Sequence, residues 1–306
     1  MTTPNSQFIG VDLGGSSIKL GKFNQKGDLI AGQVIPTPQP SVPGVVTIAI
    51  CDAIQSLDPL HQSSYVGIGL PGPIDSLGRL AKACINLPGW TEVPLADWLE
   101  PRLNRKVTLG NDGNCALLGE VWKGSAIGSS DVVLITLGTG VGGGVMLNGK
   151  LFSGSNGAAA EPGLICIDQK GPICNSGNNG SLEQFGSVSG LKRLSKFSPI
   201  ELNHLANLGD AEALSVWKEY GKNLGVGISS LIYLFTPQLV LIGGGLSASA
   251  AHFLPHVQNE VDKRVHPTSR EGVIIRKCAL GNEAGCMGAA KLAMQRFLNL
   301  MPTYKA

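Results

Sequence analysis

The chain has 306 residues, of which 43% are hydrophobic and 15% charged, and its formal net charge is +2. This length predicts two closely joined lobes, and the composition indicates a compact globular protein rather than a disordered or fibrous one. The small net charge and the lack of a Lys/Arg run exclude an extended basic surface for nucleic acid. The start of the chain lacks signal-peptide features, no apolar run is long enough for a bilayer, and seven scattered cysteines suit a reducing compartment. We therefore expect a cytoplasmic protein without a membrane or nucleic-acid partner.

The first part of the chain predicts a β-meander followed by alternating helices and strands. Residues 8–37 contain three extended runs separated by Gly-Gly and Lys-Gly-Asp turn signals, which indicates an antiparallel meander. A helix is expected at about 44–57. Buried strands are expected in SYVGIGLPGPID and KVTLGND, and a helix in GNCALLGEVWKG directly after the second of them.

From Asp131 the same pattern starts again. The segment VVLITLGTGVGGGVMLNGK is strand, glycine turn, strand and lysine-containing turn, and it aligns approximately with DLGGSSIKLGKFNQKG. This internal repeat indicates two related lobes. Later helices are expected over 182–196, 199–208 and 210–235, after the glycines of PQLVLIGGGLS, and in EAGCMGAAKLAMQRF.

The glycine-rich turns favour nucleotide binding of an unusual kind. Gly138, Gly140 and Gly143 match G-x-G-x-x-G, but a strand follows them where the dinucleotide fingerprint needs a helix. A Walker A loop is also absent, because no Gly-Lys pair is followed by Ser or Thr. The hairpin turns at 14–17 and 138–143 could instead present backbone amides and hydroxyls to phosphate from two sides. One such turn alone would be an ordinary hairpin, but two turns plus IGGG after a third strand favour a nucleotide.

Two carboxylates at strand ends are candidates for catalysis and for metal binding. Asn111 and Asp112 end a strand just before a helix, where Asp112 could serve as a general base or, equally, could cap that helix. Asp12 follows another strand in a setting that suits water-mediated Mg²⁺ binding, although it could also be a turn residue.

Six motifs occur in order along the chain: DLGGSSIKLG, GLPGPID, NLPGW, GNDGNCA, TLGTGVGGG and IGGGLS. Together they resemble the ROK family of sugar kinases and sugar-responsive regulators, over nearly the whole chain. The resemblance implies an α/β protein of the actin-like ATPase (ribonuclease H-like) fold, with mixed five-stranded sheets in two lobes around a central cleft that closes over sugar and ATP. We expect a small lobe at 1–112, with the C-terminal helix 290–306 packing back onto it, and a large lobe at 113–289. A homodimer through the larger lobe is also implied.

The same resemblance assigns roles to individual residues. Asp112 is expected to be the catalytic base, and Asp12 to hold Mg²⁺ through water. The expected sugar-binding residues are Gly72, Asn86, Asn111, Asp112, Glu161 and Glu183. The expected ATP-binding residues are Gly14, Gly15, Ser16, Lys19, Gly138, Thr139, Gly140, Gly244 and Gly245.

The sequence departs from the family at a zinc motif. Family members typically carry Glu-x-Gly-His and then Cys-x-Cys-Gly-x-x-Gly-Cys-x-Glu, whose histidine and three cysteines bind a structural zinc. Here Leu164 replaces the histidine, and Ser176 and Ser181 replace two cysteines, while Cys174 is kept. A leucine and two neutral hydroxyls cannot replace an imidazole and two thiolates, so no zinc is expected. Without the metal, the Gly-Asn-Asn-Gly loop is expected to be more mobile than in relatives.

The resemblance implies an ATP-dependent hexose kinase that makes a 6-phosphate, with glucose as the first candidate substrate. Alternatives are N-acetylmannosamine, N-acetylglucosamine, fructose or allose as acceptor, and polyphosphate as donor. A sugar-responsive regulator is disfavoured because few residues precede the first strand, and DNA recognition needs a recognition helix. A non-catalytic sugar sensor is disfavoured because both Asp12 and Asp112 are kept.

Overall fold

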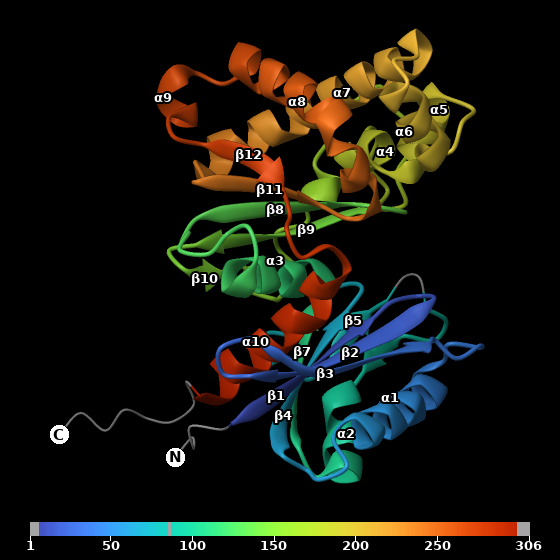
Figure 1. Ribbon diagram of the computed structural model, residues 1–306, viewed down its shortest axis with the longest axis vertical. Helices are drawn as coiled ribbons and strands as arrows, with labels where there is room; N and C mark the ends of the chain where they lie inside the picture. Colours follow the sequence, from blue (N-terminus) through green and yellow to red (C-terminus); the bar gives the residue numbers. More distant parts are fainter. Residues whose placement is uncertain (1–5, 85–86, 299–306) are drawn as a thin grey trace, which may run out of the picture. The chain divides into compact units, whose positions relative to one another are not determined.

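The computed structural model describes residues 6–84 and 87–298 (Figure 1). They form two compact units, one within 1–127, 153–159 and 282–306, the other comprising 128–152 and 160–281. Each unit contains one mixed five-stranded sheet, which confirms the predicted α/β class. None of the helices in the described part of the chain is both long and apolar enough to cross a bilayer.

The sheet of the first unit has the order β3-β2-β1-β4-β7. The predicted meander is confirmed, because β1, β2 and β3 pair antiparallel in sequence, whereas β4 and β7 extend the sheet in parallel. The strands are β1 (Gln7–Leu13), β2 (Ser17–Asn24), β3 (Leu29–Pro36), β4 (Ser63–Leu70) and β7 (Lys106–Asn111). A separate two-stranded sheet joins β5 (Ala81–Ala83) and β6 (Thr91–Val93).

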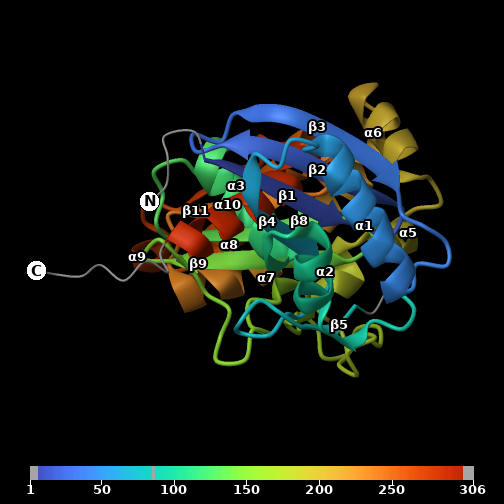
Figure 2. The same ribbon diagram turned by 90° about the horizontal axis from the view of Figure 1, so that it is seen from below.

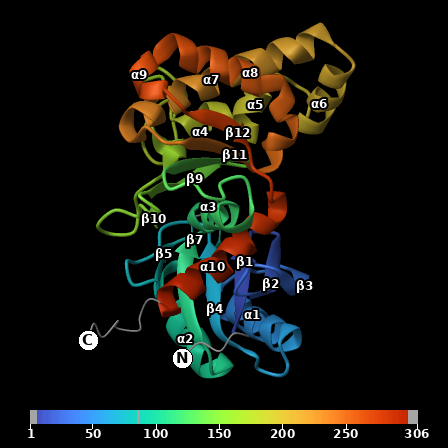
Figure 3. The ribbon, with the colours of Figure 1, turned by 60° about the vertical axis from the view of Figure 1, so that its left-hand side comes forward.

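Helices cover both faces of this sheet. Helices α1 (Pro43–Leu57) and α2 (Leu95–Leu103) lie on one face, and α10 (Ala284–Leu298) crosses the other face beside α3 (Asp112–Lys123) (Figure 1 and Figure 3). On the first face, apolar side chains of the helices and strands form one continuous buried core. The second face is arranged differently, because the strands carry glycine where α10 crosses them.

A row of glycines runs across four neighbouring strands, and two of them let α10 lie directly on the sheet. The paired residues in this row are Gly32, Gly21, Gly10 and Gly67. A Cβ atom at Gly10 would lie 1.8 Å from the carbonyl oxygen of Cys286, and one at Gly67 would lie 1.8 Å from that of Ala289. Since these distances are far below van der Waals contact, any side chain at either position would displace the helix.

The sheet of the second unit repeats the order of the first, as β10-β9-β8-β11-β12. The pair β8–β9 and the pair β9–β10 are antiparallel, and β11 and β12 are added in parallel. The predicted internal repeat is therefore present in the topology as well as in the sequence. The strands are β8 (Val132–Leu137), β9 (Val141–Leu147), β10 (Lys150–Leu151), β11 (Leu239–Gly243) and β12 (Ile274–Lys277).

The helices of the second unit pack around the long helix α7 (Ala211–Phe235). Its Trp217 and Tyr220 form an aromatic cluster with Phe253 of α8 (Ala250–Arg264), with ring centroids 5.3–5.9 Å apart. The remaining helices are α4 (Leu182–Gly186), α5 (Val188–Leu194), α6 (Pro199–Asn207) and α9 (Pro267–Arg270), with short 3₁₀ turns η1 (Pro162–Leu164), η2 (Gly245–Ser249) and η3 (Gly281–Glu283).

The prediction of a single helix over 182–196 is wrong, because the structure has two short helices there, α4 and α5. The expected helix 182–196 is interrupted at Ser187, whose side chain accepts a hydrogen bond from the Gly190 amide and caps α5. The amide of Val188 donates to the carbonyl oxygen of Gly138 at 2.8 Å instead of continuing α4. A contact with a distant glycine turn thus ends the first helix.

The two compact units have other boundaries than the lobes expected from the sequence. Helix α3 packs along α10, so the first unit continues past 112 to 127 and includes the chain from 282. The segment 153–159 also belongs there, since Lys82 Nζ donates to the Asn156 carbonyl and a Cβ at Gly157 would lie 2.0 Å from the Ile74 oxygen. This short insertion has no periodic pattern that would assign it to either lobe.

Candidate active site

In the first unit, Asp12 and Lys19 flank the glycine turn between β1 and β2. They are register partners, with 3.8 Å between the Lys19 Nζ and an Asp12 carboxylate oxygen. Burial raises the pKa of Asp12, and the positive charge of Lys19 opposes part of that rise. The turn is closed by a bond from the Gly14 amide to the Ser17 carbonyl, while Gly15 and Ser16 are exposed. A Cβ at Gly15 would meet nothing within 4 Å, so there is room for a ligand close to the backbone.

The start of α10 lies against Asp12. A Cβ at Gly285 would be 2.7 Å from the carboxyl carbon of Asp12, and Lys19 Nζ donates to the carbonyl oxygen of Asn282 at 3.4 Å. Sequence reasoning missed Gly285, although the glycines of EAGCMGAAK were a usable signal for a helix that packs closely. The N-terminus of a helix favours a neighbouring anionic group, so this arrangement partly offsets the burial of the carboxylate.

The second carboxylate, Asp112, is exposed in the first turn of α3. Asn111 is the N-cap of this helix, because its side-chain oxygen accepts from the Asn114 amide at 3.1 Å. The alternative in which Asp112 caps the helix is therefore wrong. The Asp112 carboxylate accepts from the Gly113 amide at 2.8 Å and remains at the surface of the unit. The cap and the candidate base are thus two adjacent residues with separate roles.

Asn111 also connects to Gly72, as expected if both belong to one site. Its amide nitrogen donates to the Gly72 carbonyl at 3.3 Å. Gly72 has a φ of +98°, and a Cβ there would lie 2.0 Å from the carbonyl oxygen of Ala83, so only glycine fits. Burial, followed by the negative charge of Asp112, raises the pKa of the Cys84 thiol to about 12. Asn86, expected in the same pocket, lies outside the described residues.

In the second unit, the turn between β8 and β9 is held by Glu183. The Gly138 amide donates to the Gly140 carbonyl, and a carboxylate oxygen of Glu183 accepts from the Val141 amide at 3.0 Å. A Cβ at Gly140 would lie 2.5 Å from that same oxygen. Thr139 is exposed and nothing lies within 4 Å of a Cβ at Gly138. The expected phosphate turn and the expected sugar ligand Glu183 are therefore in direct contact.

Glu161 lies close to Glu183 in this unit. Burial, with a further contribution from the charge of Glu183, raises the pKa of Glu161. The adjoining turn η1 is pressed onto β9, since a Cβ at Gly163 would be 1.9 Å from the Val141 oxygen. A carboxyl pair in which one member is easily protonated can both accept and donate hydrogen bonds to hydroxyl groups.

The third glycine segment lies beside the β8–β9 turn. Gly244 has a φ of +79°, and a Cβ there would lie 2.3 Å from the carbonyl oxygen of Leu137. Gly245 begins η2, is exposed, and has nothing within 4 Å of a Cβ position. The glycines at 138–140 and 244–245 thus form one backbone-lined surface with open space next to it, which fits the approach of phosphate.

The zinc-motif positions do not gather metal ligands. Among residues 6–84 and 87–298 there is no group of three or more His, Cys, Asp or Glu side chains that could hold a metal ion. Cys174 is buried, which would raise its pKa, but hydrogen bonds from Ser176 lower it overall. The loop is closed by backbone bonds, including Cys174 N to Asn178 O at 2.7 Å, and a Cβ at Gly180 would collide with Asp168.

Solved structures of other proteins have the same fold as this chain. A solved structure titled as a ROK family glucokinase from Streptomyces griseus with glucose and AMPPNP superimposes with a TM-score of 0.82 at 30% identity, over 95% of this chain and all of that one. The class of protein is therefore that of the actin-like ATPase fold, as predicted.

The ROK family profile matches residues 8–296, so the chain belongs to the ROK family. Relatives include a glucokinase of Halalkalibacterium halodurans, 34% identical over 94% of this chain and 95% of that protein. Another is a glucokinase of Thermotoga maritima, 32% identical over 96% of this chain and 99% of that protein. The family membership inferred from the six motifs is confirmed.

Proposed function

We propose that the chain is an ATP-dependent hexose kinase, with glucose as its first candidate substrate and the 6-hydroxyl as acceptor. The relatives named glucokinase, which cover nearly the whole chain, support this substrate. The single observation that carries the chemistry is the exposed carboxylate of Asp112 in the first turn of a helix that Asn111 caps. A solvent-facing carboxylate at the start of a helix that its neighbour caps is the kind of group that can accept a further hydrogen bond from a hydroxyl.

In the proposed mechanism, Asp112 orients the sugar hydroxyl and accepts its proton as the oxygen attacks the γ-phosphorus, while the bond from that phosphorus to the β,γ-bridging oxygen breaks and ADP leaves. Phosphoryl transfer needs an in-line nucleophile and neutralisation of charge on the phosphate oxygens. Asn111, fixed by its bonds to Asn114 and Gly72, would hold a neighbouring hydroxyl. Because the cap and the base are separate, loss of the Asp112 charge would leave α3 intact.

The glycine turns suit the binding of a nucleoside triphosphate, and Asp12 suits the binding of magnesium through water. The backbone at Gly15, Gly138 and Gly245 has open space where a side chain would be. Asp12 supplies a single carboxylate, as expected where Mg²⁺ keeps most of its waters. Such an ion, when bound, would neutralise charge on the transferring phosphate. Amides and hydroxyls of residues 14–16, 138–140 and 244–245, with Lys19, would bind the phosphates.

The remaining sugar contacts are proposed for Gly72, Asn86, Glu161 and Glu183. The raised pKa of Glu161 supports a role in which it donates as well as accepts hydrogen bonds. Leu164, which is 39% exposed, stands where family members have a histidine, and its apolar side chain is expected to affect the choice of sugar. A cytoplasmic homodimer that acts in sugar catabolism completes the proposal.

A screen of acceptors against donors tests the proposed function. Purified protein would be incubated with glucose, N-acetylmannosamine, N-acetylglucosamine, fructose or allose, each with ATP–Mg²⁺ or polyphosphate, and sugar phosphate would be measured by mass spectrometry. We expect the highest kcat/KM for glucose with ATP. Sugar binding in calorimetry without phosphate transfer from either donor would instead indicate a sugar sensor.

A further inference from the structure

The four outer strands of the two five-stranded sheets are protected very unequally. Strand β10 has only two residues, β12 carries Arg276 and Lys277, and the edge of β7 is covered because the Leu109 amide donates to Gly78. Strand β3 has eight residues, LIAGQVIP, none of them charged (Figure 2). Long, uncharged edge strands are open to pairing with another strand, and proteins usually block them.

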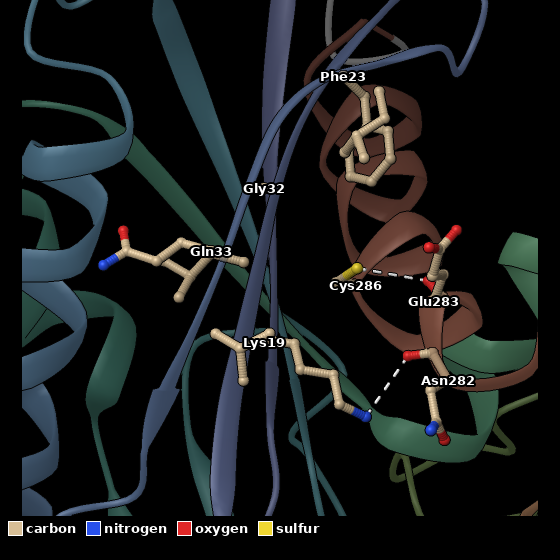
Figure 4. A pocket seen from close by; sticks show the side chains of 10 residues that line it. Lys19, Phe23, Gly32, Gln33, Asn282, Glu283 and Cys286 are labelled. Carbon is tan, nitrogen blue, oxygen red and sulfur yellow. Dashed lines mark hydrogen bonds between the residues drawn. The ribbon is translucent and has the colours of Figure 1, made fainter.

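Strand β3 also exposes apolar side chains. Leu29 is 54% exposed, Ile30 47% and Val34 66%. Beside Gly32 there is a cavity of about 210 Å³ whose walls include Phe23 of β2 and Cys286 of α10 (Figure 4). Gly32 continues the glycine row at the sheet edge, where a Cβ would meet only ordinary contacts at 3.6 Å or more. One face of this strand therefore holds an opening at Gly32 and a projecting Val34 two residues later.

We propose that β3 pairs antiparallel with β3 of a second copy of this chain, about a two-fold axis at Gln33. In that register residue 33 faces itself and residue 32 faces residue 34 of the other copy. Directly opposite residues project on the same face of a sheet, so the partner's Val34 would enter the cavity at Gly32 and the reverse contact would form by symmetry.

The other face of β3 is complementary in the same register. Ala31 faces the partner's Ile35, whose side chain packs partly against the core of its own unit, and Gln33 faces the partner's Gln33. Figure 4 shows the Gln33 amide pointing away from the cavity, and paired glutamines can exchange hydrogen bonds. A strand that matches itself at Gly32 and Val34, and that can pair its glutamines, favours a second copy over an unrelated extended segment.

This contact lies in the first unit and is separate from the homodimer through the larger lobe that the resemblance implies. One strand pair is smaller than a standard interface of about 1,600 Å², so the association is expected at micromolar concentrations. If both contacts form about perpendicular, intersecting two-fold axes, the assembly is a closed tetramer. Disrupting β3 pairing would halve the mass in either case.

Cysteine cross-linking tests the register. Gln33→Cys, Ala31→Cys and Ile35→Cys would each be made in a Cys166→Ser background, because Cys166 is an exposed native thiol. Cα atoms of directly opposite residues are about 4.5–5.5 Å apart, within disulfide range. With a mild oxidant, Gln33→Cys should form a covalent dimer on a non-reducing gel. Ala31→Cys and Ile35→Cys should cross-link only when mixed with each other. Self-cross-linking at 31 or 35, or none at 33, would overturn the proposal.

Mass measurements give an independent test. Val34→Lys should halve the mass seen in sedimentation, whereas Ile200→Lys, at a residue that is 82% exposed in the other unit, should not. Gly32→Val and Val34→Gly should each weaken association about tenfold, equivalent to ~1.4 kcal/mol, and the double variant should restore it by exchanging the small and large partners. The measurement would be made at about 50–100 µM protein, well above the micromolar range in which association is expected. If Val34→Lys then has the same mass as the wild-type protein, the pairing is contradicted.

Discussion

The two sheets share one topology but differ at equivalent positions. Asp12 and Lys19 are register partners in the first sheet, and the corresponding partners in the second are Thr136 and Gly142. The first pair carries opposite charges, whereas a Cβ at Gly142 would lie 3.0 Å from the Thr136 hydroxyl. The repeated scaffold thus has a charged turn in one unit and an uncharged, glycine-lined turn in the other. In the proposed mechanism both turns would contact phosphate through their backbone, and only the charged turn would also hold the metal.

The same contrast extends to the packing of the two sheets. Gly10 pairs with Gly67 in the first sheet, and the equivalent Leu134 pairs with Leu241 in the second. The glycines allow α10 to lie directly on the strand backbone, which brings the first turn of α10 to Asp12. In the second sheet the two leucine side chains occupy this position and are fully buried. Close helix packing in the first unit therefore positions the carboxylate that is proposed to hold Mg²⁺.

The largest effect is expected for Gly10→Val. Its side chain would overlap the Cys286 carbonyl, so α10 could not pack and the protein should fail to fold. Leu134→Val at the equivalent position should cost only about 1 kcal/mol, as for the loss of one buried methylene. Soluble yield and urea unfolding would measure both. If the Gly10→Val protein were as stable as Leu134→Val, the close packing of α10 on Gly10 would contribute nothing to the free energy of unfolding.

A smaller effect is expected for Gly140→Val in the uncharged turn. The new side chain would press on the Glu183 carboxylate and shift the turn, raising the KM for ATP on the order of tenfold, which corresponds to ~1.4 kcal/mol. Initial-rate kinetics would give this value, with Gly44→Val, at an exposed open position of α1, as control. Unchanged kinetics for Gly140→Val would remove the phosphate role of this turn.

The smallest effect concerns stability against pH at Glu161. Its pKa is raised in the folded state, so its stabilising contribution is complete below its unfolded pKa and is lost as pH rises through the folded value. Glu161→Gln should therefore be more stable than wild type at pH 8, with the difference disappearing towards pH 4. Glu201, whose pKa is lowered by bonds from Ser198, should show the opposite sign when changed to Gln. Thermal melts across this pH range would check both.

Much of the fold could be predicted because its elements are marked locally. The meander of the first sheet follows from apolar runs with turn signals, and the restart at Asp131 revealed the second sheet. The short strands β5, β6 and β12 were not identified, because three or four residues carry too little periodicity. The break at Ser187 was missed for another reason, since it depends on a bond to Gly138, far along the chain.

The site residues could be named from motifs, but their contacts could not. The motif TLGNDGNCA left open whether Asp112 is a base or the cap of the helix, and only the three-dimensional arrangement shows that its neighbour Asn111 is the cap. The contact of Gly285 with Asp12 and the bond from the Val141 amide to Glu183 join distant segments. No local pattern predicts such contacts, because they arise from how helices pack on each sheet.

The most direct measurement of the central claim is turnover of Asp112→Asn with glucose and ATP, beside calorimetric sugar binding and a thermal melt. Loss of the base should lower kcat by about 10³-fold, within the usual range for general-base removal. Sugar affinity should stay within a few-fold and the melting temperature should fall by no more than a few degrees, because Asn111 still caps α3 and only the interaction of the Asp112 charge with the helix dipole is lost. Asp52→Asn, at an exposed site on α1, should behave as wild type. An Asp112→Asn enzyme that keeps wild-type turnover would contradict the account.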